Sequence, residues 1–313
     1  MIETEKFHVL DSRDGHKKLT IRSDYIDECM EYYNEHKEID GVYICPMLGY
    51  KLKDISFLQE HKYIKGISIL DGEKLDLSGI ENLKDLEYIS ISDNTQPIDY
   101  SVFPKLEQIR STWHPKVIIS EKCSKLKHLY FRHYKPKSKN LTELPNLPNL
   151  EFLGIIQSPI ESTEGIGKFT RLKRIDMSYL PKLTTLCDME NLPIEMAEVQ
   201  NCKQLQNLDY FRVAKKLKKL ICDKCGAVQS ITFIRELKNL DHFAFLNMDV
   251  LDGDMSPCLS VRYTVFTNKK HFTHTDKEID KLKGCTVKKQ LGKHRKHIVI
   301  KGADGSITVQ FLE

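Results

Sequence analysis

One short pattern recurs along most of this chain: apolar, two variable residues, apolar, one variable residue, apolar. Copies begin at residues 39, 64, 86, 106, 126, 150, 172, 194, 217 and 240, and "LEYISI" and "LKHLYF" are two examples. Successive copies start 20 to 25 residues apart. A nearly fixed period over so much of a sequence indicates a repeat protein, in which each copy is one structural unit.

The alternation within each copy predicts a short strand with one face buried and the other exposed. The rest of each copy must return to the start of the next strand, and it carries further apolar anchors such as Leu75, Leu77, Ile80 and Leu83. No copy can bury its apolar face alone, so neighbouring copies must stack to form one continuous core. We therefore expect a solenoid.

The copies resemble the leucine-rich repeat, L-x-x-L-x-L-x-x-N/C-x-L, whose period is about 20 to 29 residues. The stretch 250–279 holds "DGDM" and then "FTNKKHF". It is similar to the closing segment of bacterial leucine-rich-repeat proteins of the short-repeat, internalin-like type, and "MLGYKLKDISFL" is similar to their entry segment. The resemblance implies an α/β solenoid with a curved parallel sheet of about ten repeats, and a bacterial origin.

The ends of the chain depart from the repeat, so we predict three parts. Residues 1–38 form an N-terminal α/β cap, 39–258 the solenoid, and 259–313 a basic C-terminal cap. In the last part, "KHIVIKGADGSITVQFL" shows two alternating runs joined by Asp-Gly, which predicts a β-hairpin. Terminal units of this kind protect the exposed ends of a stacked core.

A Cys-x-x-Cys pair, Cys222 and Cys225, lies in "LKKLICDKCGAV" and raises the alternative of a zinc site. The repeat phase places Cys222 on an inward strand position and Cys225 on the N/C position, where Cys202 falls in the preceding copy. Buried cysteine behaves as a small hydrophobe. Because no second Cys-x-x-Cys follows at the spacing of a zinc ribbon, we interpret both residues as core.

Composition bears on the compartment. The amino terminus lacks the basic and apolar regions of a secretory signal, and no run approaches the roughly eighteen apolar residues that a membrane span needs. The 9 cysteines are irregularly spaced, which favours a reducing compartment over a disulfide framework. We expect a cytoplasmic protein that makes no membrane contact.

Motifs of enzymatic chemistry are missing from the sequence. It contains no glycine-rich phosphate loop, and the histidine pairs in "HFTH" and "HRKH" lack acidic or cysteine partners at metal-ligand spacing. No nucleophile–base set can be assigned. We therefore predict a non-enzymatic protein with no catalytic residues, no metal ligands and no cofactor.

The resemblance implies that a protein partner binds on the concave sheet. Tyrosine, tryptophan and arginine are over-represented among interface hot spots. In the middle copies such residues, with a histidine and a phenylalanine, flank the inward positions or lie at the strand edge. The predicted binding residues are Tyr88, Arg110, Trp113, His128, Tyr130, Arg132, Phe152 and Arg174.

The leading functional hypothesis is thus a protein-interaction module, and its narrower form is an immunity or antitoxin-like protein that sequesters a partner. The alternative is a nucleic-acid-binding protein. The net charge is only +4, but the run 125–139 has six Lys or Arg and no acid, and 268–301 has eleven against three acids. Cationic grooves with aromatic side chains are what single strands require.

Overall fold

The computed structural model describes residues 6–12, 15–70, 75–93, 96–284, 296–301 and 307–312, the last two segments as backbone strands. The strands are β1 (Val9–Asp11), β2 (Lys17–Thr20), β3 (Gly41–Ile44), β4 (Gly66–Ile69), β5 (Tyr88–Ile91), β6 (Gln108–Thr112), β7 (His128–Arg132), β8 (Phe152–Ile156), β9 (Arg174–Ser178), β10 (Met196–Gln200), β11 (Lys219–Asp223), β12 (His242–Leu246), β13 (Tyr263–Phe266), β14 (Lys296–Lys301) and β15 (Ile307–Leu312).

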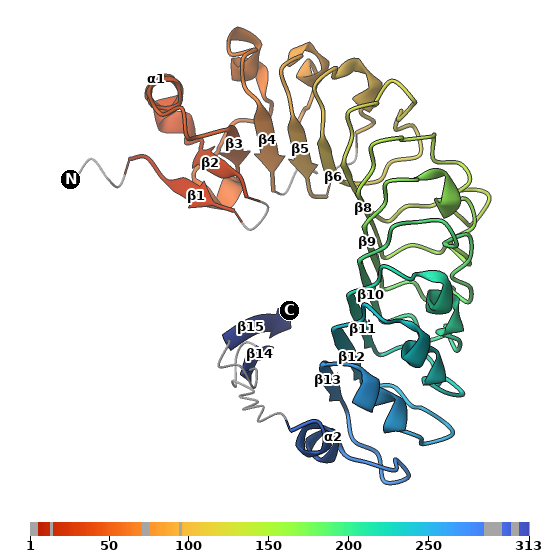
Figure 1. Cartoon of the computed structure of the whole chain (residues 1–313). Helices are drawn as coiled ribbons and strands as arrows, with labels where there is room; N and C mark the ends of the chain where they lie inside the picture. Colours follow the sequence, from red (N-terminus) through yellow and green to blue (C-terminus); the bar gives the residue numbers. More distant parts are fainter. Residues whose placement is uncertain are drawn as a thin grey trace.

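Strands β1 to β13 form one sheet in chain order, which curves into an arc with the strands on its inner side (Figure 1). The first pair is antiparallel, and every later pair, from β2–β3 to β12–β13, is parallel. Each of the ten predicted copies supplies a strand that begins two residues after the predicted start, as Tyr88 follows Leu86. The leucine-rich-repeat solenoid predicted from the sequence is confirmed.

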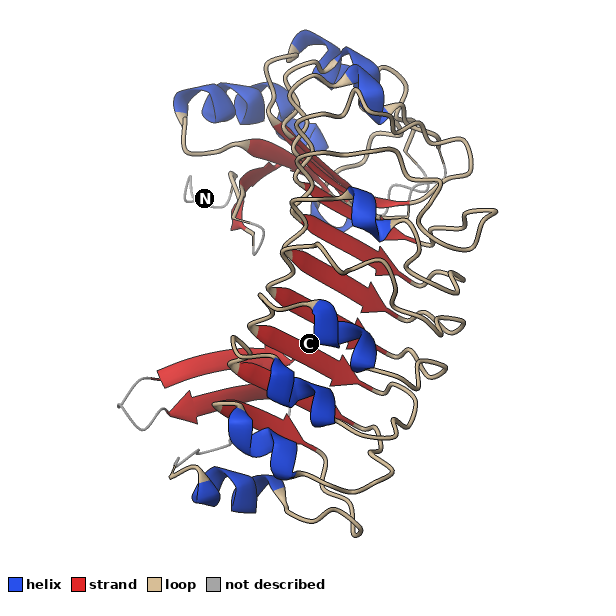
Figure 2. Cartoon of the chain, turned by 45° about the vertical axis from the view of Figure 1, so that its right-hand side comes forward, coloured by secondary structure: helices blue, strands red, loops and turns tan. Residues whose placement is uncertain are grey.

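The helices in the described part of the chain are short. The α-helices are α1 (Ile26–Glu35) and α2 (Asp276–Leu282). The 3-10 helices are η2 (Ser23–Tyr25), η3 (Pro46–Leu48), η4 (Ser56–Glu60), η6 (Ile80–Asn82), η7 (Tyr100–Val102), η8 (Ile166–Lys168), η9 (Asp209–Val213), η10 (Thr232–Glu236) and η11 (Ser256–Ser260). Figure 2 shows the strands as successive parallel steps, with short helices in the segments that connect them.

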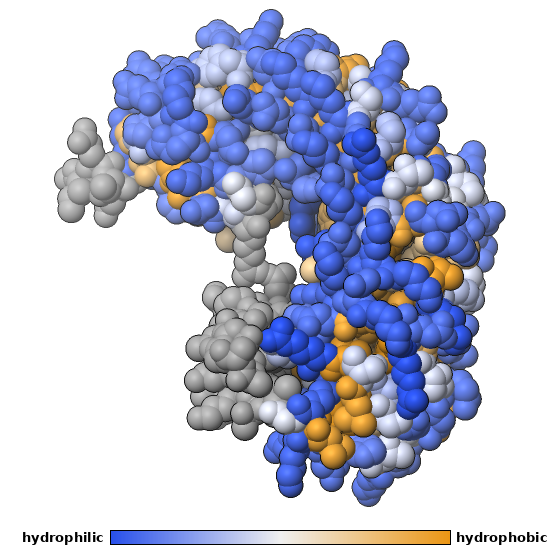
Figure 3. Space-filling model, viewed as in Figure 1, coloured by the Kyte–Doolittle hydropathy of each residue, from blue (hydrophilic) through white to orange (hydrophobic). Residues whose placement is uncertain are grey.

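The core lies between the sheet and the returning segments. One inward row runs through Ile89, Ile109, Leu129, Leu153 and Ile175, all at most 1% exposed. Anchors of the returning segments, including Phe169, Phe211 and Phe233, meet these rows and are also fully buried. The surface seen in Figure 3 is by contrast mostly hydrophilic, because the apolar side chains lie between the layers.

A left-handed residue turns the chain out of the sheet after each of the strands β7 to β12. His133, Gln157, Tyr179, Asn201, Lys224 and Asn247 all have φ between 51° and 60°. The N–H of His133 donates to the carbonyl of Ile156, the last residue of the next strand, and four others do the same. The sheet ladder thus continues into the turn, which offsets a backbone conformation that non-glycine residues seldom adopt.

The sheet extends past residues 39–258 at both ends. At the N-terminal end β2 pairs with β3, and α1 buries Cys29, Met30 and Tyr33. At the other end β13 pairs with β12, and α2 follows with a capping box formed by Thr275 and Glu278. Strands β14 and β15 pair antiparallel, as the alternating runs predict, and the turn between them lies outside the described residues.

The motif behind the sequence resemblance closes the last repeat. Asn268 accepts a hydrogen bond from the N–H of Asp276 and donates to its carboxylate, both at 2.9 Å, which fixes the start of α2. His271 lies 3.1 Å from the carbonyl of Val250. Gly253 has φ +65°, and a Cβ there would lie 2.5 Å from the His271 carbonyl oxygen. These structural contacts at the end of the solenoid therefore explain why the motif contains these residues.

The inward rows predict a steep contrast between adjacent residues. Leu129→Ala should lower the free energy of unfolding by about 2 to 5 kcal/mol, because the side chain is fully buried and its loss leaves a cavity. His128→Ala, one residue earlier on the opposite face of β7 and exposed, should change it by about 1 kcal/mol or less. Urea denaturation of both variants measures the difference. Equal costs would show that the strand phase is wrong.

Candidate functional site

The middle strands present three rows of side chains on the concave face. Register places Arg110, Tyr130 and Gly154 side by side on β6, β7 and β8. A second row holds His128, Phe152 and Arg174, and a third holds Thr112, Arg132 and Ile156. Neighbouring strands are about 4.8 Å apart, so adjacent side chains in a row are in contact range. Six of the predicted binding residues therefore lie on one continuous surface, which we call the central patch: Arg110, His128, Tyr130, Arg132, Phe152 and Arg174.

Arg110 and Tyr130 form the first stack of the patch. The guanidinium carbon of Arg110 lies 4.2 Å from the centre of the Tyr130 ring. The ring itself lies over Gly154, where a Cβ would be 2.5 Å from Cδ2 of Tyr130. Glycine thus leaves room for the tyrosine to lie along the sheet, and the arginine is held on top of it. Burial in this position raises the pKa of the Tyr130 hydroxyl.

Arg174 and Phe152 form the second stack. The guanidinium carbon of Arg174 lies 5.2 Å from the Phe152 ring centre, and His128 meets the same ring edge-on at 6.0 Å. Arg174 also pairs with Glu198 at 3.2 Å. Burial lowers the pKa of His128, so its imidazole is neutral at pH 7. The charge of this part of the patch therefore comes from the arginine and its acidic neighbour.

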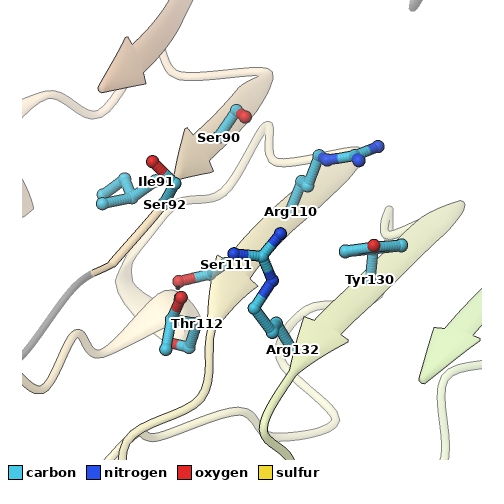
Figure 4. Close-up of a pocket in the computed structure, with 8 residues that line it drawn as sticks. All are labelled: Ser90, Ile91, Ser92, Arg110, Ser111, Thr112, Tyr130 and Arg132. Atoms are coloured by element: carbon cyan, nitrogen blue, oxygen red, sulfur yellow. Dashed lines mark hydrogen bonds between the residues drawn. The ribbon is translucent and has the colours of Figure 1, made fainter. Parts of the chain in front are cut away.

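Arg132 lies at the carboxyl end of β7, beside a shallow pocket. Figure 4 shows its side chain extending over β6 toward Ser111 and Arg110. This direction brings its guanidinium within 3.7 Å of the Asp93 carboxylate, beyond β5. Both side chains are about half exposed, so the pair contributes little to stability. Arg132 is thus oriented without being neutralised by a buried partner.

Tyr88 was expected to be exposed with the patch, and this is wrong. It is on the outward face but only 3% exposed. Its ring covers Gly41 and Gly66 of the two preceding strands, where a Cβ would overlap it. His16 stacks on the ring at 3.8 Å, and Lys18 lies 5.1 Å from its centre. The N-terminal hairpin therefore covers Tyr88, a contact between segments far apart in the sequence.

Trp113 lies at the strand edge, as its position predicts, and is only partly exposed. Its ring packs against the core and stands edge-on to buried Tyr134 at 5.7 Å. The backbone N–H of Trp113 donates to the Arg132 carbonyl at 2.8 Å. Trp113 therefore supports the end of β7, where Arg132 lies.

Several contributors to the site were not among the predicted binding residues. Gly154 makes room for Tyr130, and the hydroxyl groups of Ser90 and Thr112 line the pocket beside the arginines. Toward β9, Asp176 is half-buried and accepts a hydrogen bond from Ser178, and burial raises its pKa. The available sequence signal was the repeat phase, which places Ser90, Thr112, Gly154 and Asp176 outward.

The basic run 125–139 does not form a single surface. Lys127 pairs with Glu107 at 2.6 Å, ahead of the strand, whereas Arg132 belongs to the concave face. Lys139 lies beyond the strand and pairs with Glu161 at 2.9 Å. The cations of the run therefore lie on different surfaces. Lys127 and Lys139 are each paired with an acid of a neighbouring repeat. The second basic segment, 268–301, lies partly outside the described residues.

The cysteines of the later repeats are packed and protonated. Sγ of Cys225 donates to the Val199 carbonyl at 3.4 Å, and Sγ of Cys202 donates to the Met177 carbonyl at the same distance. Burial raises the pKa of Cys225 to about 11 and that of Cys202 to about 12, and raises that of Cys222 well above the usual value. Within the described residues, no group of three or more His, Cys, Asp or Glu could hold a metal ion.

Three solved structures from Listeria monocytogenes have similar folds. The functional domain of InlJ, described as including a cysteine ladder, has a TM-score of 0.47 and 14% identity, and the match covers 71% of this chain and 55% of that domain. The internalin InlF gives a TM-score of 0.40 and 16% identity over 80% of this chain and 87% of InlF. The internalin C2 gives 0.34 and 13% over 59% of this chain and 83% of C2.

These similarities concern the fold alone, and the chain spans little more than half of the InlJ domain. No protein-family model and no curated protein matches the sequence. In the described part of the chain, no helix is both long and apolar enough to cross a membrane.

The covering of Tyr88 predicts a coupled effect of two substitutions. Gly66→Ala should lower the free energy of unfolding by about 1 to 3 kcal/mol, because the new methyl group overlaps the Tyr88 ring. In a Tyr88→Ala background the overlap is gone, so the same change should cost about 1 kcal/mol less. Urea denaturation of the four proteins gives both costs. An identical cost in the two backgrounds would contradict the packing described for Tyr88.

Proposed function

We propose that this chain is a non-enzymatic protein-interaction module that binds a protein partner on the central patch. The observation that carries the proposal is the pair of adjacent guanidinium–aromatic stacks, Arg110 on Tyr130 and Arg174 on Phe152. These side chains lie outside the inward rows, so they are available to a partner without disturbing the core.

The stacks also suit binding energetically. Tyrosine and arginine are enriched among hot spots because a large planar group can exclude water while it donates hydrogen bonds. Association normally costs free energy to immobilise long side chains. Arg110 and Tyr130 are already held by one another over Gly154, so less ordering remains when a partner binds. A rigid sheet beneath them keeps the spacing fixed.

The narrower proposal is an immunity or antitoxin-like protein of a bacterial cytoplasm, for which binding is itself the activity. A surface made of aromatic and guanidinium groups on a solenoid supports a role in sequestering another protein. The eight described cysteines are free thiols, which supports a reducing compartment.

The test is a binding measurement on the full chain with a partner captured from the source cell. Tyr130→Ala combined with Arg132→Ala should weaken binding, measured by calorimetry, by about 2 kcal/mol, or roughly thirtyfold. The unfolding free energy should fall by about 1 kcal/mol or less, because neither side chain fills the core.

A matched variant controls for the loss of charge. Arg212→Ala combined with Arg235→Ala removes a partly exposed and an exposed arginine from η9 and η10, outside the sheet, and should leave binding unchanged. Unchanged binding by a folded Tyr130/Arg132 variant would reject the central patch as the site. Tight binding of a random DNA or RNA single strand near physiological salt would instead favour the nucleic-acid alternative, since phosphate-driven binding weakens steeply with salt.

A further inference from the structure

A shallow pocket on the concave face between β5, β6 and β7 combines two guanidinium groups with several hydroxyl groups (Figure 4). Its lining residues are Ser90, Ile91, Ser92, Arg110, Ser111, Thr112, Tyr130 and Arg132. The register explains the set, because Ser90, Arg110 and Tyr130 are neighbours in one row and Thr112 and Arg132 in another. Two cations are therefore brought together on the concave face, with hydroxyl donors beside them.

Arg110 retains most of its hydrogen-bonding capacity in this arrangement. Its stack on Tyr130 uses the face of the guanidinium, so the N–H groups at the edge remain directed outward in the plane. Among the residues that the structure describes, no carboxylate forms an ion pair with Arg110. Arg110 is thus a fixed positive group that no carboxylate contacts directly, although Asp176 acts on it electrostatically from the same row.

The other wall of the pocket can also accept an acidic ligand. The ion pair of Arg132 with Asp93 is long, at 3.7 Å, and exposed, so a better-placed carboxylate can compete with it. The Thr112 hydroxyl oxygen accepts the Asp93 N–H at 3.1 Å, which leaves the Thr112 hydroxyl proton to donate elsewhere. Arg110, Arg132 and Thr112 therefore offer donors to one oxyanion.

We propose that this pocket binds the carboxylate of an Asp or Glu side chain in an extended segment of the protein partner. The inference rests on the proposed function and adds the chemistry of the ligand. Guanidinium groups match a planar carboxylate because two parallel N–H···O bonds can form. A partner segment that reaches the central patch would thus be anchored at β6 and β7 by an acid.

Acids further along the same face favour a peptide over a nucleic-acid strand. The row of Arg110 and Tyr130 continues through Gly154 to Asp176 on β9 and Glu198 on β10. These carboxylates would repel the successive phosphates of a single strand. A peptide can instead carry an acidic and a basic side chain at different positions. Strands β6 and β9 are about 14 Å apart, a distance that an extended peptide spans in about four residues. We therefore expect a Lys or Arg about four residues from the bound acid.

The experiment selects peptides from a random phage-displayed library on the full wild-type chain and measures synthetic versions by fluorescence anisotropy. The selected peptides should share an Asp or Glu. Changing that residue to its amide should weaken binding to the wild-type chain at least about tenfold. On a chain with Arg110→Gln and Arg132→Gln, the same peptide change should have almost no effect, because the arginines that bind the acid are already absent.

Arg171→Gln, an exposed arginine outside the patch, is the matched control and should leave peptide affinity unchanged. Circular dichroism and thermal unfolding establish that each variant is folded. Peptides that lose affinity on the Phe152→Ala chain but show no dependence on an acid would overturn the pocket while supporting the central patch. Peptides insensitive to every patch variant, or failure to select any, would count against both. Stronger Arg110-dependent binding of an oligothymidylate than of any peptide at physiological salt would assign the pocket to phosphate.

Discussion

Each turn of this solenoid can bury its apolar side chains only against the turns before and after it. The inward row from Ile89 to Ile175 and the returning phenylalanines Phe169 and Phe211 are fully buried because neighbouring repeats cover them. This mutual burial fixes which strand residues face inward. It thereby also fixes which residues face the concave side, where Arg110 and Tyr130 are free to serve a partner.

The same dependence explains what the sequence could predict of the fold. Ten strands followed from the apolar period, because the core requires an apolar side chain at each inward position. The apolar period does not extend to β2 or β13, since His16 and Thr264 stand where the pattern calls for apolar residues. The left-handed turns at His133 and Lys224 were missed, because the ladder that supports them involves the next repeat, not the residue type.

The candidate site was predicted in outline, and its details depend on contacts between distant segments. Tyr88 and Tyr130 both occupy outward strand positions, yet only Tyr130 belongs to the accessible patch. His16 covers Tyr88, and no residue near Tyr88 in the sequence indicates that contact. Each tyrosine lies over a glycine of an adjoining strand, Gly66 or Gly154, so the aromatic rings follow the sheet and hold the cations placed on them.

Hydroxyl-radical footprinting of the full chain, with and without its captured partner, tests most directly whether the concave face of β6 to β9 is the binding surface. Our account predicts that the partner protects Tyr130 and Phe152 from oxidation and leaves Tyr210, on η9, unchanged. Protection of Tyr210 with no change at Tyr130 and Phe152 would contradict it, because the partner would then bind the outer side of the arc.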